Sequence, residues 1–237
     1  AVTTGALGLF EVALVWGIGV ALAIHLTAAR SGAHLNPAVT LAGAVWNGFP
    51  WRRVPGYWAG QLAGAFAAAA LLYVLFAGAL AGYEAAHGLV RGQPGSEGSA
   101  MVFGEYFPNP RTKSIRMTEA RAFAAEAAGT AVLLLVIGGL TDPANRSRPR
   151  LLAPLLIGLT VTLLIALLGP LTMACFNPAR DLGPRLFSAC AGWGAVPFRA
   201  NGWGWLTVYV IAPCVGAVIG GGLYRLLFRP GYRCGTI

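Results

Sequence analysis

Long apolar stretches alternate with short polar or glycine-rich segments along this chain. Five of the stretches reach the length of about 20 residues that a helix needs to cross the hydrocarbon core of a bilayer. They cover residues 9–29, 54–80, 119–140, 151–168 and 204–228. The pattern predicts an all-α membrane protein.

Two shorter segments, residues 31–40 and 169–187, interrupt this pattern, and both contain the tripeptide Asn-Pro-Ala. The Asn is suited to cap a helix, and the Pro to occupy its first position. The helices expected over 37–46 and 178–189 are too short to cross a bilayer. Repeated interrupted segments predict two half-membrane helices that meet at a substrate pathway. The motif residues are Asn36, Pro37, Ala38, Asn177, Pro178 and Ala179.

Arginines near the ends of the apolar stretches favour one orientation. Those in the short segments fall on one side if the spans alternate, and the positive-inside rule makes that side cytoplasmic. Residues 81–118 then form a long extracellular loop, and residues 229–237 a cytoplasmic tail. Residues 1–80 and 119–228 become two inverted repeats.

Comparing the two repeats exposes a difference. The second repeat has a spanning stretch that begins near Glu119, well before its Asn-Pro-Ala motif. A stretch at the matching place in the first repeat would begin upstream of residue 1. We therefore expect the first transmembrane helix to be missing from this chain through a cropped N-terminus, and a natural five-span protein is the alternative.

The composition also indicates which classes of protein this chain does not resemble. The 237 residues are 57% apolar and only 11% charged, whereas soluble domains carry about 25% charged residues. The net charge of +9 comes from basic residues between apolar spans, which argues against nucleic-acid binding. The four cysteines have no metal or disulfide spacing, and enzyme signatures are absent. We expect no enzymatic activity, no cofactor and no metal.

Irregular backbone at membrane depth has to line a water-filled cavity, since lipid satisfies no backbone polar group. We expect the amides of Asn36 and Asn177 to face this cavity, opposite a row of backbone oxygens. These carbonyl groups belong to Gly32, Ala33 and His34 in the first segment and to Met173, Ala174 and Cys175 in the second. Two facing half-helix N-termini, each with about half a positive charge, would repel cations and protons.

Several polar residues are candidates for roles along this pathway. Arg180 would donate hydrogen bonds to a passing hydroxyl and repel cations, because a charge within a membrane usually faces a wet cavity. Glu126 is expected to order the second irregular segment by accepting backbone N–H bonds, rather than to relay protons. His34 is expected to orient its loop rather than gate it, and Gln61 to bond a neighbouring helix. Asp181 could pair with a loop partner, widen the vestibule or favour the helix start.

The motifs SGAHLNPAVT and GPLTMACFNPARDLGPRLF closely resemble those of the major intrinsic protein (aquaporin) family, within its bacterial glycerol facilitator (aquaglyceroporin) branch. Asp181 after the second motif marks the glycerol branch. The resemblance implies an aquaporin-like right-handed bundle of inverted repeats with two half-membrane helices. It also implies homotetramers with one pore per subunit in the bacterial inner (plasma) membrane.

The family narrows its pore at four positions, which correspond here to Trp16, Ile165, Ala174 and Arg180. Glycerol facilitators usually carry Gly at the second position and Phe at the third, so this set is closer to plant nodulin-type intrinsic proteins. We expect a passive channel for glycerol and small neutral polyols that also passes some water and excludes ions and protons. A water-selective or boric and arsenious acid channel, a coupled transporter and a closed structural protein are the alternatives.

Overall fold

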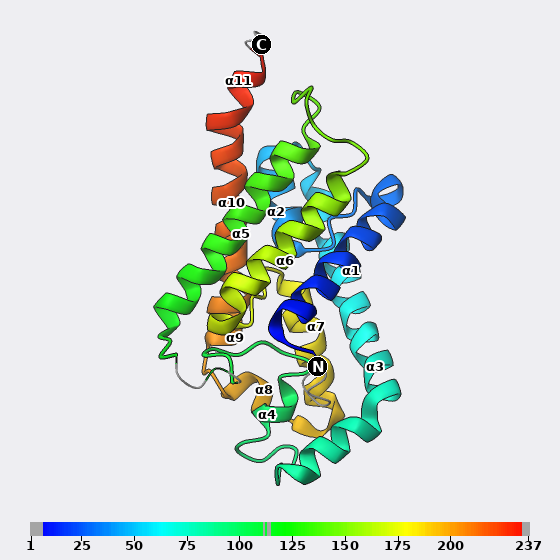
Figure 1. The fold of residues 1–237 in the computed structure, drawn as a ribbon, viewed down its shortest axis with the longest axis vertical. Helices are drawn as coiled ribbons and strands as arrows, with labels where there is room; N and C mark the ends of the chain where they lie inside the picture. The colour runs from blue at the N-terminus through cyan, green and yellow to red at the C-terminus, as the bar shows by residue number, and fades with distance from the viewer. Residues whose placement is uncertain (1–6, 111, 113–114, 234–237) are drawn as a thin grey trace.

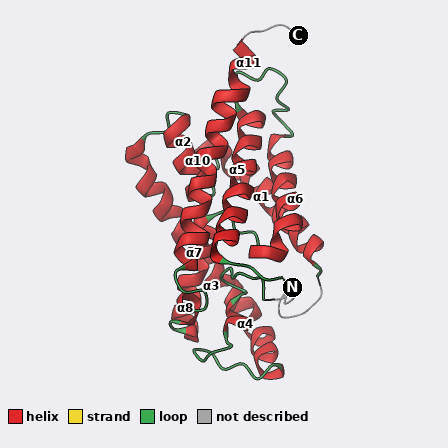
Figure 2. Ribbon diagram, turned by 90° about the vertical axis from the view of Figure 1, so that its left-hand side faces the viewer, coloured by secondary structure: helices red, strands yellow, loops and turns green. Residues whose placement is uncertain are grey.

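A computed structural model describes residues 7–110, 112 and 115–233. Figures 1 and 2 show helices running along the long axis, with loops gathered toward the two ends, and the described residues form no strand. Five helical stretches of the described chain are long and apolar enough to cross a membrane: Leu9–Ser31, Trp51–Ala86, Glu119–Thr141, Ala153–Thr172 and Gly204–Tyr232. The all-helical membrane architecture expected from the sequence is confirmed.

The long spanning helices are α1 (Leu9–Ser31), α3 (Val54–Ala86, after the turn Trp51–Arg53), α5 (Glu119–Thr141) and α6 (Ala153–Thr172). The two half-helices are α2 (Pro37–Trp46) and α7 (Pro178–Ser188). The last span joins α9 (Gly204–Leu206), Thr207–Ile211, α10 (Ala212–Leu223), Tyr224–Phe228 and α11 (Arg229–Arg233). Short helices lie outside the spans: α4 (Glu97–Ala100), Ala189–Trp193 and α8 (Val196–Arg199).

The helices α3 and α6 both extend beyond their predicted ends. The helix α3 continues to Ala86, beyond the expected end at Leu80. The helix α6 continues through residues 169–172, where Gly and Pro suggested an irregular start. Asn109 supports this last turn, because its backbone N–H donates to the Leu171 carbonyl oxygen at 3.2 Å and its Nδ2 to the carbonyl oxygen of residue 169 at 2.9 Å. The second irregular segment is therefore only Met173–Asn177.

Small residues let two pairs of long helices approach closely, as is common in membranes. The helices α5 and α10 meet where a Cβ atom added at Gly216 or Gly220 would lie 2.1 or 2.0 Å from a backbone oxygen of α5. The helices α1 and α6 meet in the same way at Gly17 and Gly158, where added Cβ atoms would lie 2.4 and 2.2 Å from the facing backbone oxygen. These two contacts position the irregular segments between them.

Gly56, Gly60 and Gly64 fall four residues apart on α3, a spacing that permits close contact with another helix. No described atom lies within 4 Å of a Cβ placed at any of these glycines. Instead, α3 packs through another face against α7, where a Cβ added at Gly183 would lie 2.7 Å from the Cβ of Ala65. Small side chains alone did not reveal which face of α3 is covered.

The segment between α3 and α5 is also less polar and loop-like than expected. It contains α4, and it buries Phe103, Tyr106 and Phe107 against the rest of the chain. Trp193 is completely buried beside it and donates from Nε1 to the hydroxyl of Ser99 at 2.9 Å. This segment therefore forms a packed cap over one end of the bundle, which we call the outer cap (residues 87–110).

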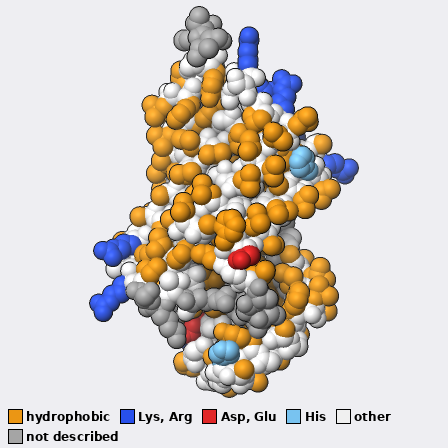
Figure 3. All heavy atoms as spheres, viewed as in Figure 1, with side chains coloured by type: hydrophobic (Ala, Val, Ile, Leu, Met, Phe, Trp, Pro, Cys, Tyr) orange, Lys and Arg blue, Asp and Glu red, His pale blue; other side chains and the backbone are white. Residues whose placement is uncertain are grey.

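The outer surface fits a bilayer. Figure 3 shows a broad apolar face, with Arg side chains around its margins at the top, the right and the lower left. Leu26 and Val74 are 80% and 75% exposed on spanning helices. The chain is thus a multi-pass membrane protein. Of the predicted tail, residues 229–233 continue the last helix and residues 234–237 lie outside the described residues, as do residues 1–6.

Candidate functional site

The two irregular segments have matching backbone shapes. Positive φ angles occur four, three and one residues before each motif Asn: at Gly32 (71°), Ala33 (49°) and Leu35 (55°), and at Met173 (66°), Ala174 (60°) and Phe176 (52°). Non-glycine residues in this region cost of order 1–3 kcal/mol each, so the surrounding structure must hold them there. The same unusual path in both segments supports an inverted repeat.

The two motif asparagines tie the segments together. Each caps its own half-helix, with Asn36 Oδ1 accepting from Ala38 N at 2.8 Å and Asn177 Oδ1 accepting from Ala179 N at 3.1 Å. Each amide also reaches across, since Asn36 Nδ2 donates to the Phe176 carbonyl at 2.8 Å and Asn177 Nδ2 to the Leu35 carbonyl at 2.9 Å. One amide hydrogen of each Asn therefore remains for another partner.

A hydroxyl-bearing residue begins each segment and makes matching contacts. The hydroxyls of Ser31 and Thr172 both accept from the backbone N–H two residues later, at 3.3 Å. Their carbonyl oxygens accept from tyrosine hydroxyls, that of Ser31 from Tyr57 at 2.9 Å and that of Thr172 from Tyr209 at 3.1 Å. The two tyrosines lie on α3 and on the last span, which correspond in the repeat.

Glu126 of α5 holds the second segment. Its Oε1 accepts from the Thr172 hydroxyl at 2.6 Å and from Cys175 N at 3.0 Å, and its Oε2 accepts from Phe176 N at 2.8 Å. Glu126 is 0% exposed. These contacts fit the ordering role expected from the sequence, and they occupy both oxygens. Among the described residues, no side chain accepts from the corresponding N–H groups of His34 and Leu35.

The carbonyl groups that the sequence predicts to line the pathway belong to residues 32–34 and 173–175. None of the carbonyl oxygens of residues 32–34 and 173–175 accepts a hydrogen bond from the described part of the chain. Ala174 and Cys175 themselves are 3% and 5% exposed. The side chain of Ala174 packs in an apolar cluster with Ile165 and Phe176.

Two cavities share part of their lining. A cavity of about 630 Å³ is lined by the first irregular segment, α3 and α7, and includes Asn177. A second cavity of about 560 Å³ lies toward the outer cap and includes Ile165 and Glu105. Trp16 and Arg180 line both cavities. The structure thus brings together three of the four predicted filter residues, whereas Ala174 lies on neither cavity.

Two side chains, those of Trp16 and Glu105, contact the guanidinium group of Arg180. Its guanidinium carbon lies 4.5 Å from the centre of the Trp16 ring, as in a cation–π contact. Its Nη1 forms an ion pair with Oε1 of Glu105 in the outer cap. Glu105 is not among the site residues predicted from the sequence, because the whole segment has the composition of a polar loop. A lone acidic residue inside the apolar run MVFGEYF was the signal that could have revealed it.

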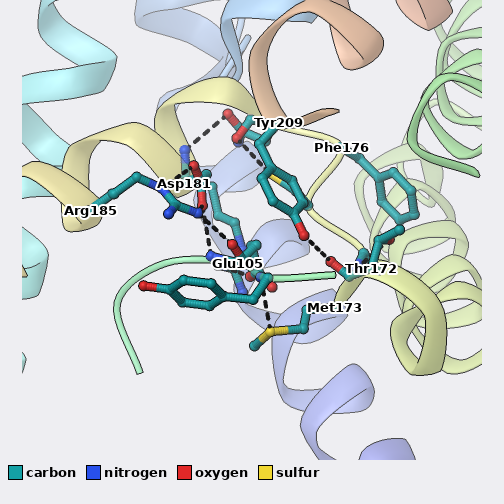
Figure 4. A network of polar contacts seen from close by, with 12 residues as sticks. Glu105, Thr172, Met173, Phe176, Asp181, Arg185 and Tyr209 are labelled. Carbon is teal, nitrogen blue, oxygen red and sulfur yellow. Dashed lines mark hydrogen bonds and ion pairs between the residues drawn. The ribbon is translucent and has the colours of Figure 1, made fainter. Parts of the chain in front are cut away.

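The helix α7 clamps the backbone of Glu105 (Figure 4). Asp181 Oδ1 accepts from Glu105 N at 2.7 Å, and Arg185 Nη2 donates to the Glu105 carbonyl. Arg185 also binds Asp181 at 2.8 Å through Nε and at 2.7 Å through Nη2. Of the three roles left open for Asp181, the structure therefore realises the pairing with a loop.

The first half-helix has its own polar support. Thr40 Oγ1 lies 3.1 Å from His34 Nδ1, and it accepts from Gln61 Nε2 of α3 at 3.1 Å. The His34 ring also packs at a tilt against the rings of Phe49 and Tyr57, with centroids 4.7 and 5.1 Å away. Gln61 makes the helix–helix hydrogen bond expected of it, and the His34 contacts fit an orienting role.

Comparison with known proteins agrees with this geometry. The family model described as "Major intrinsic protein" matches residues 1–224. The glycerol uptake facilitator of Pseudomonas aeruginosa is 43% identical over 221 residues, covering 93% of this chain and 77% of the relative. The propanediol uptake facilitator PduF of Citrobacter freundii is 40% identical over 236 residues, covering 99% and 86%. The X-ray structure of the aquaglyceroporin from Plasmodium falciparum superposes with a TM-score of 0.82 at 28% identity, covering 98% of this chain and 88% of that one. The chain belongs to the major intrinsic protein family.

Proposed function

We propose that this chain is a passive channel for glycerol and other small neutral polyols, which also passes some water and excludes ions and protons. The observation that carries the proposal is the meeting of two matched irregular segments, each tied to the other by its motif Asn. Relatives named glycerol and propanediol uptake facilitators support the choice of solute.

The chemistry of the pathway suits a polyol. The carbonyl oxygens of residues 32–34 and 173–175 are available to accept from solute hydroxyls. The remaining amide hydrogens of Asn36 and Asn177 and the guanidinium of Arg180 are donors for solute oxygens. The carbon backbone of glycerol would pass along Trp16 and Ile165. A polyol can therefore exchange its water hydrogen bonds for protein ones at each step.

Ions have no comparable replacement for their hydration. The N-termini of α2 and α7 both carry partial positive charge where the segments meet, and Arg180 adds a full charge beside them. Cations and protons are repelled by this combination. We extend this proposal to Trp16, Ile165, Ala174 and Arg180 as the selectivity filter and to Glu126 as the residue that keeps the second segment in place.

The resemblance to this family also suggests how the chain assembles and in which membrane it lies. We propose a homotetramer in the bacterial inner membrane, with the C-terminal end of the chain in the cytoplasm. The arginines near that end, including Arg146, Arg148 and Arg225, fit the positive-inside rule. The broad apolar face provides the lipid contact.

Swelling of proteoliposomes in a glycerol gradient tests the function. Vesicles with the protein should swell much faster than protein-free vesicles, at a rate proportional to the gradient. Equal swelling rates would refute the channel. Uptake that saturates and depends on an ion gradient would instead indicate a coupled transporter, for which the described residues contain no cluster of three or more metal-binding side chains.

A further inference from the structure

A buried acidic side chain lies beside the candidate filter, outside the spanning helices. Glu105 is 0% exposed, and its Oε1 pairs with Nη1 of Arg180. Its Oε2 is also buried and accepts no hydrogen bond from the described residues. A buried carboxyl oxygen without a hydrogen-bond partner costs free energy, so contacts elsewhere have to hold Glu105 in this place.

Those contacts are the backbone bonds to α7. The N–H of Glu105 donates to Asp181, and its carbonyl accepts from Arg185. Both partners belong to α7, the helix that also carries Arg180. The position of Glu105 relative to the guanidinium is therefore fixed by one rigid element, as Figure 4 shows for Glu105, Asp181 and Arg185.

We propose that Glu105 is a positioning residue for solute selection: it holds the guanidinium of Arg180 to one side of the passage and so leaves room for a polyol. This inference rests on the proposed channel function. The guanidinium lies between the Glu105 carboxyl and the Trp16 ring, and Ile165 lines the same cavity. Without its carboxyl partner, the long Arg180 side chain gains rotamers that extend over the passage. Glycerol, being wider than water, is obstructed more.

Several charged and titratable groups surround Glu105 and influence its protonation. Two guanidinium groups, of Arg180 and Arg185, and two carboxyl groups, of Asp181 and Glu126, act on it. The hydroxyls of Tyr106 and Tyr209 and the thiol of Cys175 are the other titratable groups coupled to it. Burial raises the pKa of Glu105 to about 8, against the opposing effect of Arg180.

This pKa gives the pairing a pH dependence with a definite sign. Below about pH 8 the carboxyl group is protonated and attracts the guanidinium only as a neutral hydrogen-bond partner. Above that pH it is a carboxylate, and charge-assisted pairing is roughly twice as strong. The ratio of glycerol to water permeability should therefore rise as pH increases through 8.

The test compares stopped-flow glycerol and water permeabilities of proteoliposomes that hold the full chain, its Glu105→Gln and Glu105→Ala variants, or Glu97→Gln as a control. Glu97 lies in the same outer cap, and its carboxylate accepts from Gly95 N at 2.9 Å. At pH 9 we expect the glycerol-to-water permeability ratio to fall by about tenfold or more in Glu105→Ala, as for loss of one hydrogen bond to a charged group. The control should keep the wild-type ratio.

An unchanged or increased ratio in both Glu105 variants would overturn the inference while leaving the channel function intact. If neither variant assembles, the wild-type protein still tests the inference. Its glycerol-to-water permeability ratio is then measured from pH 6.5 to pH 9.5. If this ratio does not change with pH in the wild type, or if it rises equally in Glu105→Gln, then Glu105 is not the group responsible. A wild-type protein that passes no glycerol refutes the proposed function itself.

Discussion

Replacing Glu126 with Gln tests how the second irregular segment is held. The carboxylate accepts three hydrogen bonds, from the Thr172 hydroxyl and from the backbone N–H groups of Cys175 and Phe176. An amide keeps one acceptor oxygen and replaces the other with an NH₂ donor. If the oxygen stays at the Oε1 position, two bonds persist and only the Phe176 N–H loses its acceptor.

The cost follows from that single loss. A buried donor without a partner costs about 1–3 kcal/mol, and here it lies beside residues already held at positive φ. This is a large fraction of a net stability that is typically about 5–15 kcal/mol. We expect Glu126→Gln to lower the free energy of unfolding by about 2 kcal/mol and to reduce glycerol permeability, since Phe176 O is the partner of Asn36.

Thermal unfolding in detergent and vesicle swelling measure the two effects. The matched control is Glu119→Gln, which changes an exposed carboxylate at the start of the same helix. The amide oxygen of Gln can still accept the hydrogen bond that Glu119 Oε1 receives from the Thr207 hydroxyl. The control should unfold and conduct like the wild type. If Glu126→Gln is as stable and as permeable as the control, the three contacts do not hold the segment, and our account of it is wrong.

Three further predictions follow from the same geometry. Arg180→Val should admit protons or cations while glycerol still passes, as measured by vesicle acidification, and intact proton exclusion would place the barrier elsewhere. Ile165→His should shift selectivity toward water, and an unchanged water-to-glycerol ratio would mean that residue 165 is not in the filter. Because burial raises the pKa of Glu105 from 4.5 to about 8, the folded protein favours the protonated form. The associated stability is complete below pH 4.5 and is lost as pH rises through 8, so the wild-type melting temperature should fall between pH 6 and pH 9 more than that of Glu105→Gln.

Much of the fold could be predicted from the sequence because each signal is local. Five apolar stretches identify the spans, since length and composition decide whether a helix fits a bilayer. The pairs Asn36–Pro37 and Asn177–Pro178 identify two helix starts, since capping depends on neighbouring residues only. The positions of the arginines between the spans predicted the inverted arrangement, which the resemblance of the motifs also implied and the matched contacts support.

Boundaries and tertiary contacts could not be predicted in the same way. The turn at Gly169 and Pro170 stays helical because Asn109, far away in sequence, binds it. No local pattern predicts that contact.

The outer cap shows the same limit for the candidate site. Glu105 is brought to Arg180 by the Asp181–Arg185 clamp, which joins residues 76 positions apart. Reading the segment as polar and exposed concealed a buried carboxyl group next to the filter. Its position depends on packing of the whole cap, including Trp193, which composition does not reveal.

The most direct test of the central claim records glycerol influx and proton leak in the same proteoliposomes. The account predicts that glycerol enters far faster than into protein-free vesicles, without an ion gradient and without saturation, while the proton leak stays at the protein-free level. Glycerol entry at the protein-free rate, or entry accompanied by a matching proton leak, would contradict it.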